Sequence, residues 1–306
     1  MKMIYSKENG KVLRTGEIKK GSLIRLVDPS EYEIREAVNS LGVDEDFILD
    51  PLDEDERARA EVDEESLLVI LKVPIKLDEE SRLPYRTSSL GIILTPEQTL
   101  IVSKRALPFI DEKIERLDIK KRSRMLFQML QIVAAEFLRH LKDIQTSIDD
   151  VEEELHRSLR NKEIEELMKL EKGLVYFVTS LKSNEIVMER LLKGNIIPLY
   201  EEDRDILEDA IVDTRQAIDT ANIFSDILAG MMDAYASIIS NNLNIVMKIL
   251  AVMTIVLEIP TLLSSFYGMN VSLPLQHSPH AFLHIIVWSA VSIILILFWF
   301  RRKRWI

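Results

Sequence analysis

Residues 249–270 read ILAVMTIVLEIPTLLSSFYGMN, and this stretch decides the fold of the chain. Its only charged residue is Glu258, and its length matches the ~20 residues that a helix needs to cross ~30 Å of hydrocarbon. A second apolar run, AFLHIIVWSAVSIILILFWF, covers residues 281–300. The segment between the two runs is short, so we expect a helical hairpin that spans a membrane.

The charges that flank the two spans predict their orientation. The connecting segment 271–280 contains no Lys or Arg, whereas the second span is followed by the basic run 301–304 and Lys248 precedes the first span. The positive-inside rule therefore predicts a protein of the cell membrane whose two termini lie in the cytoplasm. The first thirty residues show no signal-peptide pattern, so we expect no export of the N-terminal part. The predicted basic ring consists of Lys248, Arg301, Arg302, Lys303 and Arg304.

The chain is acidic overall, with 39 Lys and Arg against 50 Asp and Glu, which argues against nucleic-acid binding. Ten of the carboxylates lie between Glu201 and Asp233, against only Arg204 and Arg215. Two interpretations stay open for this acidic segment: a solvated helix face, or a surface that attracts cations when copies of the chain assemble. The absence of Cys is consistent with a reducing compartment.

Short β-rich runs mark the N-terminal part, at residues 22–27, 67–75, 89–94 and 100–103. A helix begins between the first two, because Ser30 and Glu33 have the spacing of a capping box. We expect residues 51–65 to be a charged connection. From about residue 121 the pattern changes to long helices with few Gly or Pro, at 122–159 and 163–192, which should pack as an antiparallel pair. A single helix from 201 to 269 should follow.

These patterns predict an α+β protein: an N-terminal mixed α/β cytoplasmic domain, a long helical stalk and two C-terminal transmembrane helices. The predicted parts are the α/β domain (1–120), the helix pair (121–200), the cytoplasmic part of the stalk helix (201–248), the first span (249–270), the external loop (271–280), the second span (281–300) and the basic tail (301–306).

A polar stripe runs along the long helix. Steps of three and four residues back from Gly268 reach residues that are almost all small or polar: Ser265, Thr261, Glu258, Thr254, Ala251, Met247, Asn244, Ser240, Ser237, Asp233, Gly230 and Asp226. A 3.5-residue repeat is the period of a supercoiled bundle, but the seam of an ordinary coiled coil is apolar. This periodicity therefore indicates a seam that faces water.

Within the span the stripe is costly for an isolated hairpin, because an intramembrane carboxylate such as Glu258 costs ~2.5 kcal/mol or more. Several copies of the helix around one axis would place the stripe on a shared water-filled lumen. The alternative is that the small residues mediate helix contacts and that Glu258 is protonated.

The segment Tyr267-Gly268-Met269-Asn270, at the end of the first of two C-terminal spans, resembles the signature of the CorA family of magnesium and cobalt channels. The basic run followed by Trp305 resembles the end of family members. Further similar segments are 230–235, 240–244, 246–248 and the charged stretch 50–57.

The resemblance implies a funnel-shaped homopentamer with its long helices around one pore. Gly268, Met269 and Asn270 would form the selectivity filter, with Asn270 binding the water shell of Mg²⁺, an ion that gives up its waters reluctantly. Met247 and Leu250 match an apolar constriction, and Asn244 and Asp233 match polar rings. Asp209 and Asp213 are candidates for a regulatory Mg²⁺ site between subunits that holds the closed state.

The sequence departs from the family pattern in two places. Glu258 stands where relatives commonly have an apolar or small residue, and the loop 271–280 lacks a carboxylate. His277, His280 and His284 could offer a softer site for Co²⁺, Ni²⁺ or Zn²⁺, or they could be ordinary loop and helix histidines.

We therefore expect a divalent-cation channel for Mg²⁺ uptake, with Co²⁺ and Ni²⁺ as further substrates, gated by cytoplasmic Mg²⁺. The chain has no nucleotide-binding motif, and no cofactor is expected. The zinc-transporting branch of the same superfamily and a non-transporting helical scaffold or sensor are alternatives. An enzyme is not expected, because His140 and His156 are isolated in the sequence and no catalytic cluster is visible.

Overall fold

The computed structural model describes residues 1–8, 10–63, 65–77, 81, 83–157, 161–194, 196–275, 278–303 and 305, with the backbone alone at 156, 157 and 161. His277, Arg304 and the side chain of His156 therefore lie outside the described residues. The chain divides into two compact units, Met1–Ala229 and Gly230–Ile306.

A seven-stranded sheet forms the centre of the N-terminal part of the first unit, with the order β2-β1-β3-β7-β6-β5-β4. Its strands are Lys2–Glu8 (β1), Lys11–Thr15 (β2), Leu23–Val27 (β3), Arg59–Asp63 (β4), Ser66–Lys76 (β5), Tyr85–Leu94 (β6) and Thr99–Ser103 (β7). Only β3 and β7 pair in parallel, with Leu23 opposite Thr99, and the other neighbours are antiparallel. The predicted mixed α/β domain is thus confirmed.

Short helices pack on this sheet: Glu31–Leu41 (α1), Glu45–Leu49 (α2) and the 3-10 turn Asp50–Leu52 (η1). Their apolar side chains, including Ile34, Phe47 and Ile48, form one core with Ile24 and Leu68 of the strands. The predicted capping box is present, because the Ser30 N–H donates to Glu33 Oε2 at 2.9 Å and the Glu33 N–H donates to Ser30 Oγ at 3.3 Å.

Three strands depart from the sequence-based expectation. The strands β1 and β2 were not predicted, and the expected connection at 51–65 is wrong because it contains β4. The strand β4 is an edge strand that is largely exposed. Because it carries Arg, Glu and Asp side chains, its sequence lacks the alternation of apolar residues that marks a strand.

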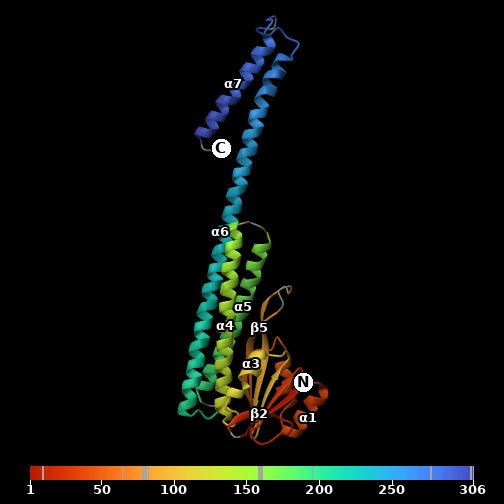
Figure 1. The fold of residues 1–306 in the computed structure, drawn as a ribbon, viewed down its shortest axis with the longest axis vertical. Helices are drawn as coiled ribbons and strands as arrows, with labels where there is room; N and C mark the ends of the chain where they lie inside the picture. The colour runs from red at the N-terminus through yellow and green to blue at the C-terminus, as the bar shows by residue number, and fades with distance from the viewer. Residues whose placement is uncertain are drawn as a thin grey trace. The chain divides into compact units, whose positions relative to one another are not determined.

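Two short elements and three long helices complete the first unit. The short elements are the helix Pro108–Lys113 (α3) and the 3-10 turn Ile114–Arg116 (η2). The long helices are Arg122–Arg157 (α4), Asn161–Leu192 (α5) and the first part of Glu201–Tyr267 (α6). As predicted, α4 and α5 pack together and run in opposite directions, and both contact the sheet at β5 (Figure 1). Arg215 of α6 forms ion pairs with Glu185 and Glu189 of α5, each at 2.6 Å.

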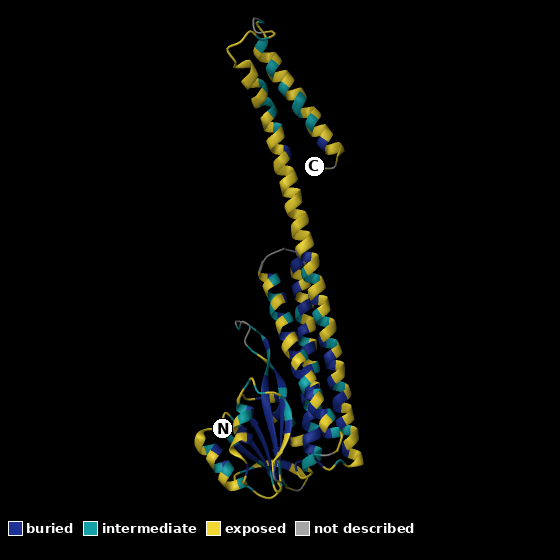
Figure 2. Cartoon of the chain, turned by 180° about the vertical axis from the view of Figure 1, so that it is seen from behind, coloured by how far each residue is buried: buried dark blue, intermediate teal, exposed yellow. Residues whose placement is uncertain are grey.

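The second unit is a hairpin of the rest of α6 and α7, which spans Ala281–Arg302 (Figure 1). Both helices are long and apolar enough to cross a membrane, with mean hydropathies of 2.1 and 2.5 in their most apolar windows. Almost none of those windows is buried, and Figure 2 shows exposed residues along both helices. Pro260 lies inside α6, which continues for about two turns beyond it.

Candidate ion pathway

The polar stripe of α6 lies open in the single chain. Every residue of the predicted pore lining in the second unit is exposed: Asp233, Ser237, Ser240, Asn244, Met247, Leu250, Ala251, Thr254, Glu258, Thr261 and Ser265. Nothing in the described part of the chain covers these residues. The polar stripe is therefore an uncovered surface that could line a water-filled lumen or contact a neighbouring helix.

The hydroxyl groups of the polar stripe bond back to their own helix. Thr254 Oγ1 donates to the carbonyl of Leu250, and Thr261 Oγ1 donates to the carbonyl of Leu257, both at 2.9 Å. Ser237 Oγ makes the same bond to Asp233 at 3.0 Å. Because the hydroxyl protons are used within the helix, the oxygen lone pairs remain available on the exposed side. Such a face presents acceptors, which suit a hydrated cation.

Two charged side chains of α6 have no ion-pair partner among the described residues. They are Glu258, which is part of the stripe, and Lys248, which follows the stripe residue Met247, and both are exposed. Glu258 lies one helical turn from Thr254 and three residues before Thr261, so it adds a carboxylate to a row of hydroxyl acceptors.

The Gly268-Met269-Asn270 segment begins where α6 ends. The Gly268 N–H donates to the carbonyls of Ser264 at 3.0 Å and Ser265 at 3.2 Å, which closes the helix. A Cβ at Gly268 would lie 3.3 Å from the Ser264 carbonyl oxygen, a tight contact that glycine avoids. Met269 and Asn270 follow outside the helix and are exposed.

Tyr267 contacts the loop that follows Asn270, a contact that the sequence did not reveal. Its hydroxyl donates to the carbonyl of Pro274 at 3.3 Å. An apolar cavity of about 240 Å³ lies between α6 and α7 beside this bond, lined by Tyr267, His284 and Trp288 among others. The bond fixes the path of the segment that directly follows Asn270.

The basic residues and the histidines lie at opposite ends of α7. Arg301 and Arg302 occupy its last turn, and the Lys303 N–H donates to the Trp299 carbonyl at 3.1 Å. At the other end, His280 precedes the first helical residue, and the His284 N–H donates to the His280 carbonyl at 3.1 Å. Among the described residues, no group of three or more His, Asp or Glu side chains could hold a metal ion. The predicted histidine site therefore stays a prediction.

The regulatory candidates Asp209 and Asp213 lie one turn apart on α6 in the first unit. Asp209 is exposed and Asp213 is partly buried. Partial burial, together with the charge of Asp209, raises the pKa of Asp213. Burial and the charge of Asp209 thus disfavour the charged form of Asp213, and a bound divalent cation would offset both.

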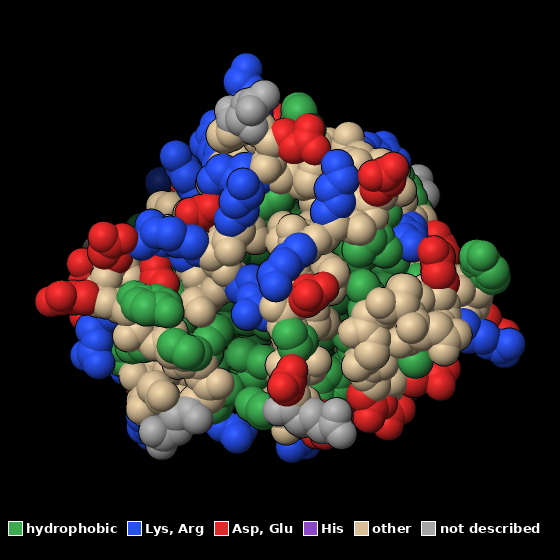
Figure 3. Space-filling model, turned by 90° about the horizontal axis from the view of Figure 1, so that it is seen from below, with side chains coloured by type: hydrophobic (Ala, Val, Ile, Leu, Met, Phe, Trp, Pro, Cys, Tyr) green, Lys and Arg blue, Asp and Glu red, His purple; other side chains and the backbone are tan. Residues whose placement is uncertain are grey.

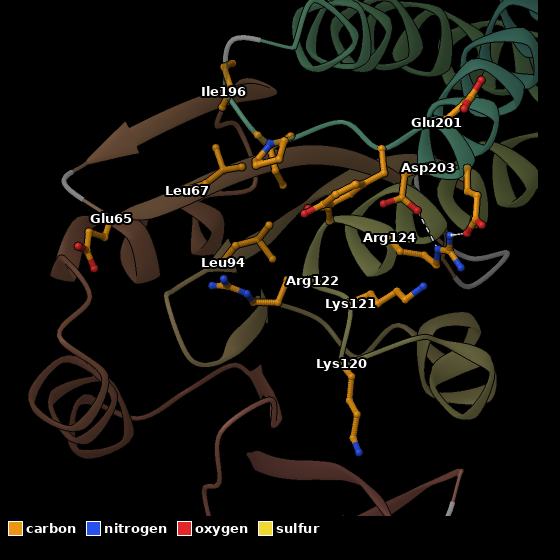
Figure 4. Close-up of a pocket in the computed structure, with 15 residues that line it drawn as sticks. Glu65, Leu67, Leu94, Lys120, Lys121, Arg122, Arg124, Ile196, Glu201 and Asp203 are labelled. Atoms are coloured by element: carbon orange, nitrogen blue, oxygen red, sulfur yellow. Dashed lines mark hydrogen bonds and ion pairs between the residues drawn. The ribbon is translucent and has the colours of Figure 1, made fainter.

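Two cavities open in the first unit. The larger, about 820 Å³, lies where α4 and α6 begin and is lined by residues of both signs, including Lys120, Lys121 and Glu201 (Figure 4). Arg124 binds Asp203 at 2.7 Å and also Glu202, while Lys120 points away from the other lining residues (Figure 4).

Figure 3 shows both signs of charge interspersed on the face seen from below, unlike the continuous basic surface that nucleic-acid binding requires.

The second cavity, about 740 Å³, is lined by residues of β5, α3 and α4. The residues around this cavity show that the sequence-based interpretation of His140 as isolated is wrong. His140 is buried, and Arg139 Nη2 lies 3.3 Å from its Nε2. The neighbouring Glu136 is also buried and binds Arg139 Nη2 at 2.6 Å. The i,i+4 spacing of Glu136 and His140 was the one signal in the sequence that could have indicated this cluster.

An α/β unit joined to a hairpin of two apolar helices, one with a free polar face, defines a helical membrane protein. The chain belongs to the CorA-like Mg²⁺ transporter family, whose profile matches residues 22–302. The family is one of transporters, which agrees with the expectation of a non-enzymatic function.

Relatives match along most of their length. The cobalt/magnesium transport protein CorA of Methanocaldococcus jannaschii is 31% identical over 290 residues, covering 91% of this chain and 89% of that protein. The protein of the same name from Thermotoga maritima is 23% identical, covering 84% of this chain and 75% of that protein. The complete structure of the M. jannaschii CorA magnesium transporter superposes with a TM-score of 0.88 at 28% identity, covering 100% and 99% of the two chains. The predicted fold class is thereby confirmed.

Proposed function

We propose that this protein is a channel that carries Mg²⁺, and also Co²⁺, into the cell down the electrochemical gradient. Family membership and the names of the two relatives, both cobalt/magnesium transport proteins, support this substrate class. The polar stripe carries the proposal. Hydroxyls, an amide and a carboxylate along the exposed face of an apolar helix would be costly against lipid, whereas they suit a water-filled pore.

In the proposed assembly, a homopentamer, the α6 helices surround one pore. Gly268, Met269 and Asn270 form its outer filter, and the exposed Asn270 amide accepts hydrogen bonds from the water shell of Mg²⁺. Met247 and Leu250 form an apolar constriction that closes by dewetting. The lone-pair oxygens of Thr254 and Thr261 line the pore between these two regions.

Orientation and regulation complete the proposal. The termini lie in the cytoplasm, where Lys248 and the basic residues at the end of α7 face the inner surface of the membrane. Asp209 and Asp213 bind cytoplasmic Mg²⁺ together with a neighbouring subunit and stabilise the closed state by mass action. The raised pKa of Asp213 supports this role, because a site that holds two mutually repelling carboxylates gains most from a divalent cation.

The experiment that tests the proposed function is metal uptake into proteoliposomes, with Mg²⁺, Co²⁺, Ni²⁺ and Zn²⁺ compared under an inside-negative potential. We expect saturable uptake of Mg²⁺ and Co²⁺. Uptake of Zn²⁺ alone would instead assign the chain to zinc transport, and the absence of uptake for all four metals would favour a scaffold or sensor.

A further inference from the structure

The second cavity of the first unit is separate from the proposed ion pathway and from Asp209 and Asp213. It lies against the end of β5, the turn before α3, and the middle of α4. Its wall combines apolar side chains, such as Leu107 and Phe109, with several charged ones. Its volume, about 740 Å³, is in the range that binds small organic molecules.

Among the described residues that line this cavity, cations outnumber carboxylates. The cationic side chains are Lys76, Arg105, Lys113 and Arg139, and the carboxylates are Glu112 and Glu136. Arg139 forms an ion pair with Glu136, and Arg105 forms one with Glu54. In the described part of the chain, Lys76 and Lys113 form no ion pair. The Lys76 ammonium instead lies 5.6 Å from the centroid of the Tyr85 ring.

A buried polar atom in the lining of this cavity, Nδ1 of His140, also lacks a hydrogen-bond partner among the described residues. His140 is only 4% exposed. Its ring is in edge contact with that of Tyr85, with centroids 6.1 Å apart. Buried polar atoms are nearly always hydrogen-bonded, so an unpartnered one in a cavity wall points to a missing ligand.

The other ring nitrogen of His140 has neighbours. Nε2 lies 3.3 Å from Arg139 Nη2 and 3.5 Å from Glu136 Oε1, so Nδ1 is the ring nitrogen left without a partner. Burial, together with the positive charge of Arg139, lowers the pKa of His140, so the ring is neutral. The nearest carboxylate oxygen, in Asp143, is 3.9 Å from Nδ1, too far for a hydrogen bond.

Two ammonium groups with no carboxylate partner among the described residues and a buried imidazole nitrogen without a partner suit the same ligand, a group rich in anionic oxygens. We propose that this cavity binds a phosphate-bearing anion, with phosphate at Lys76 and Lys113 and any organic part against Leu107 and Phe109. Phosphate is the shared chemistry of inorganic phosphate and nucleoside phosphates, both solutes of the cytoplasm, where the proposed orientation puts this unit.

The larger cavity at the start of α4 provides an internal comparison. Its lining also includes two lysines that form no ion pair with any described residue, Lys120 and Lys121, but it has as many acidic as basic described residues. None of the buried unpartnered side-chain atoms that the described residues contain belongs to its lining. Its lysines therefore serve as a control for charge alone.

The test is calorimetric titration of the detergent-solubilised full chain, free of divalent cations, with ADP, inorganic phosphate and adenosine. We expect ADP and phosphate to bind at millimolar concentrations or below and adenosine not to bind. Tighter binding of ADP than of phosphate would assign the apolar wall to the nucleoside, and equal binding would assign free phosphate as the ligand.

The double substitution Lys76→Gln with Lys113→Gln should weaken ADP binding at least about tenfold, because each lost charged contact removes a strong hydrogen bond. The control, Lys120→Gln with Lys121→Gln, should bind as the wild type does. An unchanged circular dichroism spectrum verifies that both variants fold. The proposal is overturned if the wild type binds neither ADP nor phosphate, if adenosine binds as well as ADP, or if the control loses as much affinity as the Lys76 and Lys113 variant.

Discussion

The side-chain amide of Asn184 on α5 makes two hydrogen bonds with the main chain of Lys72 on β5. Its Oδ1 accepts from the Lys72 N–H at 2.8 Å, and its Nδ2 donates to the Lys72 carbonyl at 2.7 Å. The neighbouring strand β4 pairs with β5 only as far as Ile70. Asn184 therefore takes the place of the missing strand at Lys72 and attaches the long helices to the sheet.

Replacing Asn184 with Ala should destabilise the first unit, because Asn184 is buried and the Lys72 N–H and carbonyl would lose their partners. We expect a loss of about 2–4 kcal/mol and a melting temperature lower by roughly 5–10 °C. Thermal unfolding followed by circular dichroism measures the effect. Asn222→Ala, at an exposed position of α6, is the control and should leave the melting temperature unchanged.

Asp213→Asn should weaken the inhibition of influx by Mg²⁺ on the cytoplasmic side, because it removes one of the two proposed regulatory carboxylates. We expect the half-inhibitory Mg²⁺ concentration to rise roughly tenfold, equivalent to ~1.4 kcal/mol. Flux into proteoliposomes with set internal Mg²⁺ measures it. Asp219→Asn, an exposed change on the same helix, is the control. Equal inhibition in Asp213→Asn and the wild type would contradict the regulatory role.

The inhibition by Mg²⁺ should also depend on pH in the wild type. The pKa of Asp213 is raised, so this carboxyl group takes up its proton at a higher pH than an ordinary aspartate. A protonated carboxyl group binds Mg²⁺ poorly, so inhibition should weaken as the internal pH falls. Inhibition that strengthens on acidification would show that the sign is wrong.

Glu258→Gln should lower Mg²⁺ influx roughly threefold or more, because it removes the only carboxylate of the first span from the proposed pore. Proteoliposome flux at a fixed Mg²⁺ concentration measures the change. Ser265→Ala, a neutral change on the same polar stripe, should retain the wild-type influx. Influx that is the same in Glu258→Gln and the wild type would place this carboxylate away from the ion.

Asn270→Ala should reduce Mg²⁺ influx by at least about tenfold, because the filter would lose the amide that binds the water shell of the ion. Ser272→Ala, two residues further along the outer loop, serves as the control. Size-exclusion chromatography should show the same oligomer for both variants, so that a loss of flux reports on the filter. Influx that is unchanged in Asn270→Ala would remove this residue from the pathway.

The sequence contains the repeating patterns of this fold but not its long-range contacts. Periodicity predicted the long helices, because they follow from spacing along the chain, whereas the polar stripe as a pore lining stays a prediction. The hairpin of β1 and β2 could also have been predicted, since Asn9-Gly10 is a typical dipeptide of such turns. The strand β4 could not, because its exposed charged residues resemble those of a loop.

The contacts that sequence reasoning missed join distant residues. Asn184 and Lys72 are 112 positions apart, and no spacing rule relates them. The cluster around His140 likewise needs Tyr85 from another element. The proposed pore depends on further copies of the chain, whose contacts no spacing rule within one chain describes.

The most direct test of the central claim, that the polar stripe lines the pore, uses a natural feature of the chain. Because the chain has no Cys, single cysteines can be introduced without background. Thr254→Cys lies on the stripe and Ile255→Cys beside it, and both positions are exposed in the single chain. We predict that a charged, membrane-impermeant thiol reagent blocks Mg²⁺ influx through Thr254→Cys and spares Ile255→Cys. Block of both variants, or of Ile255→Cys alone, would contradict a pore lined by this stripe.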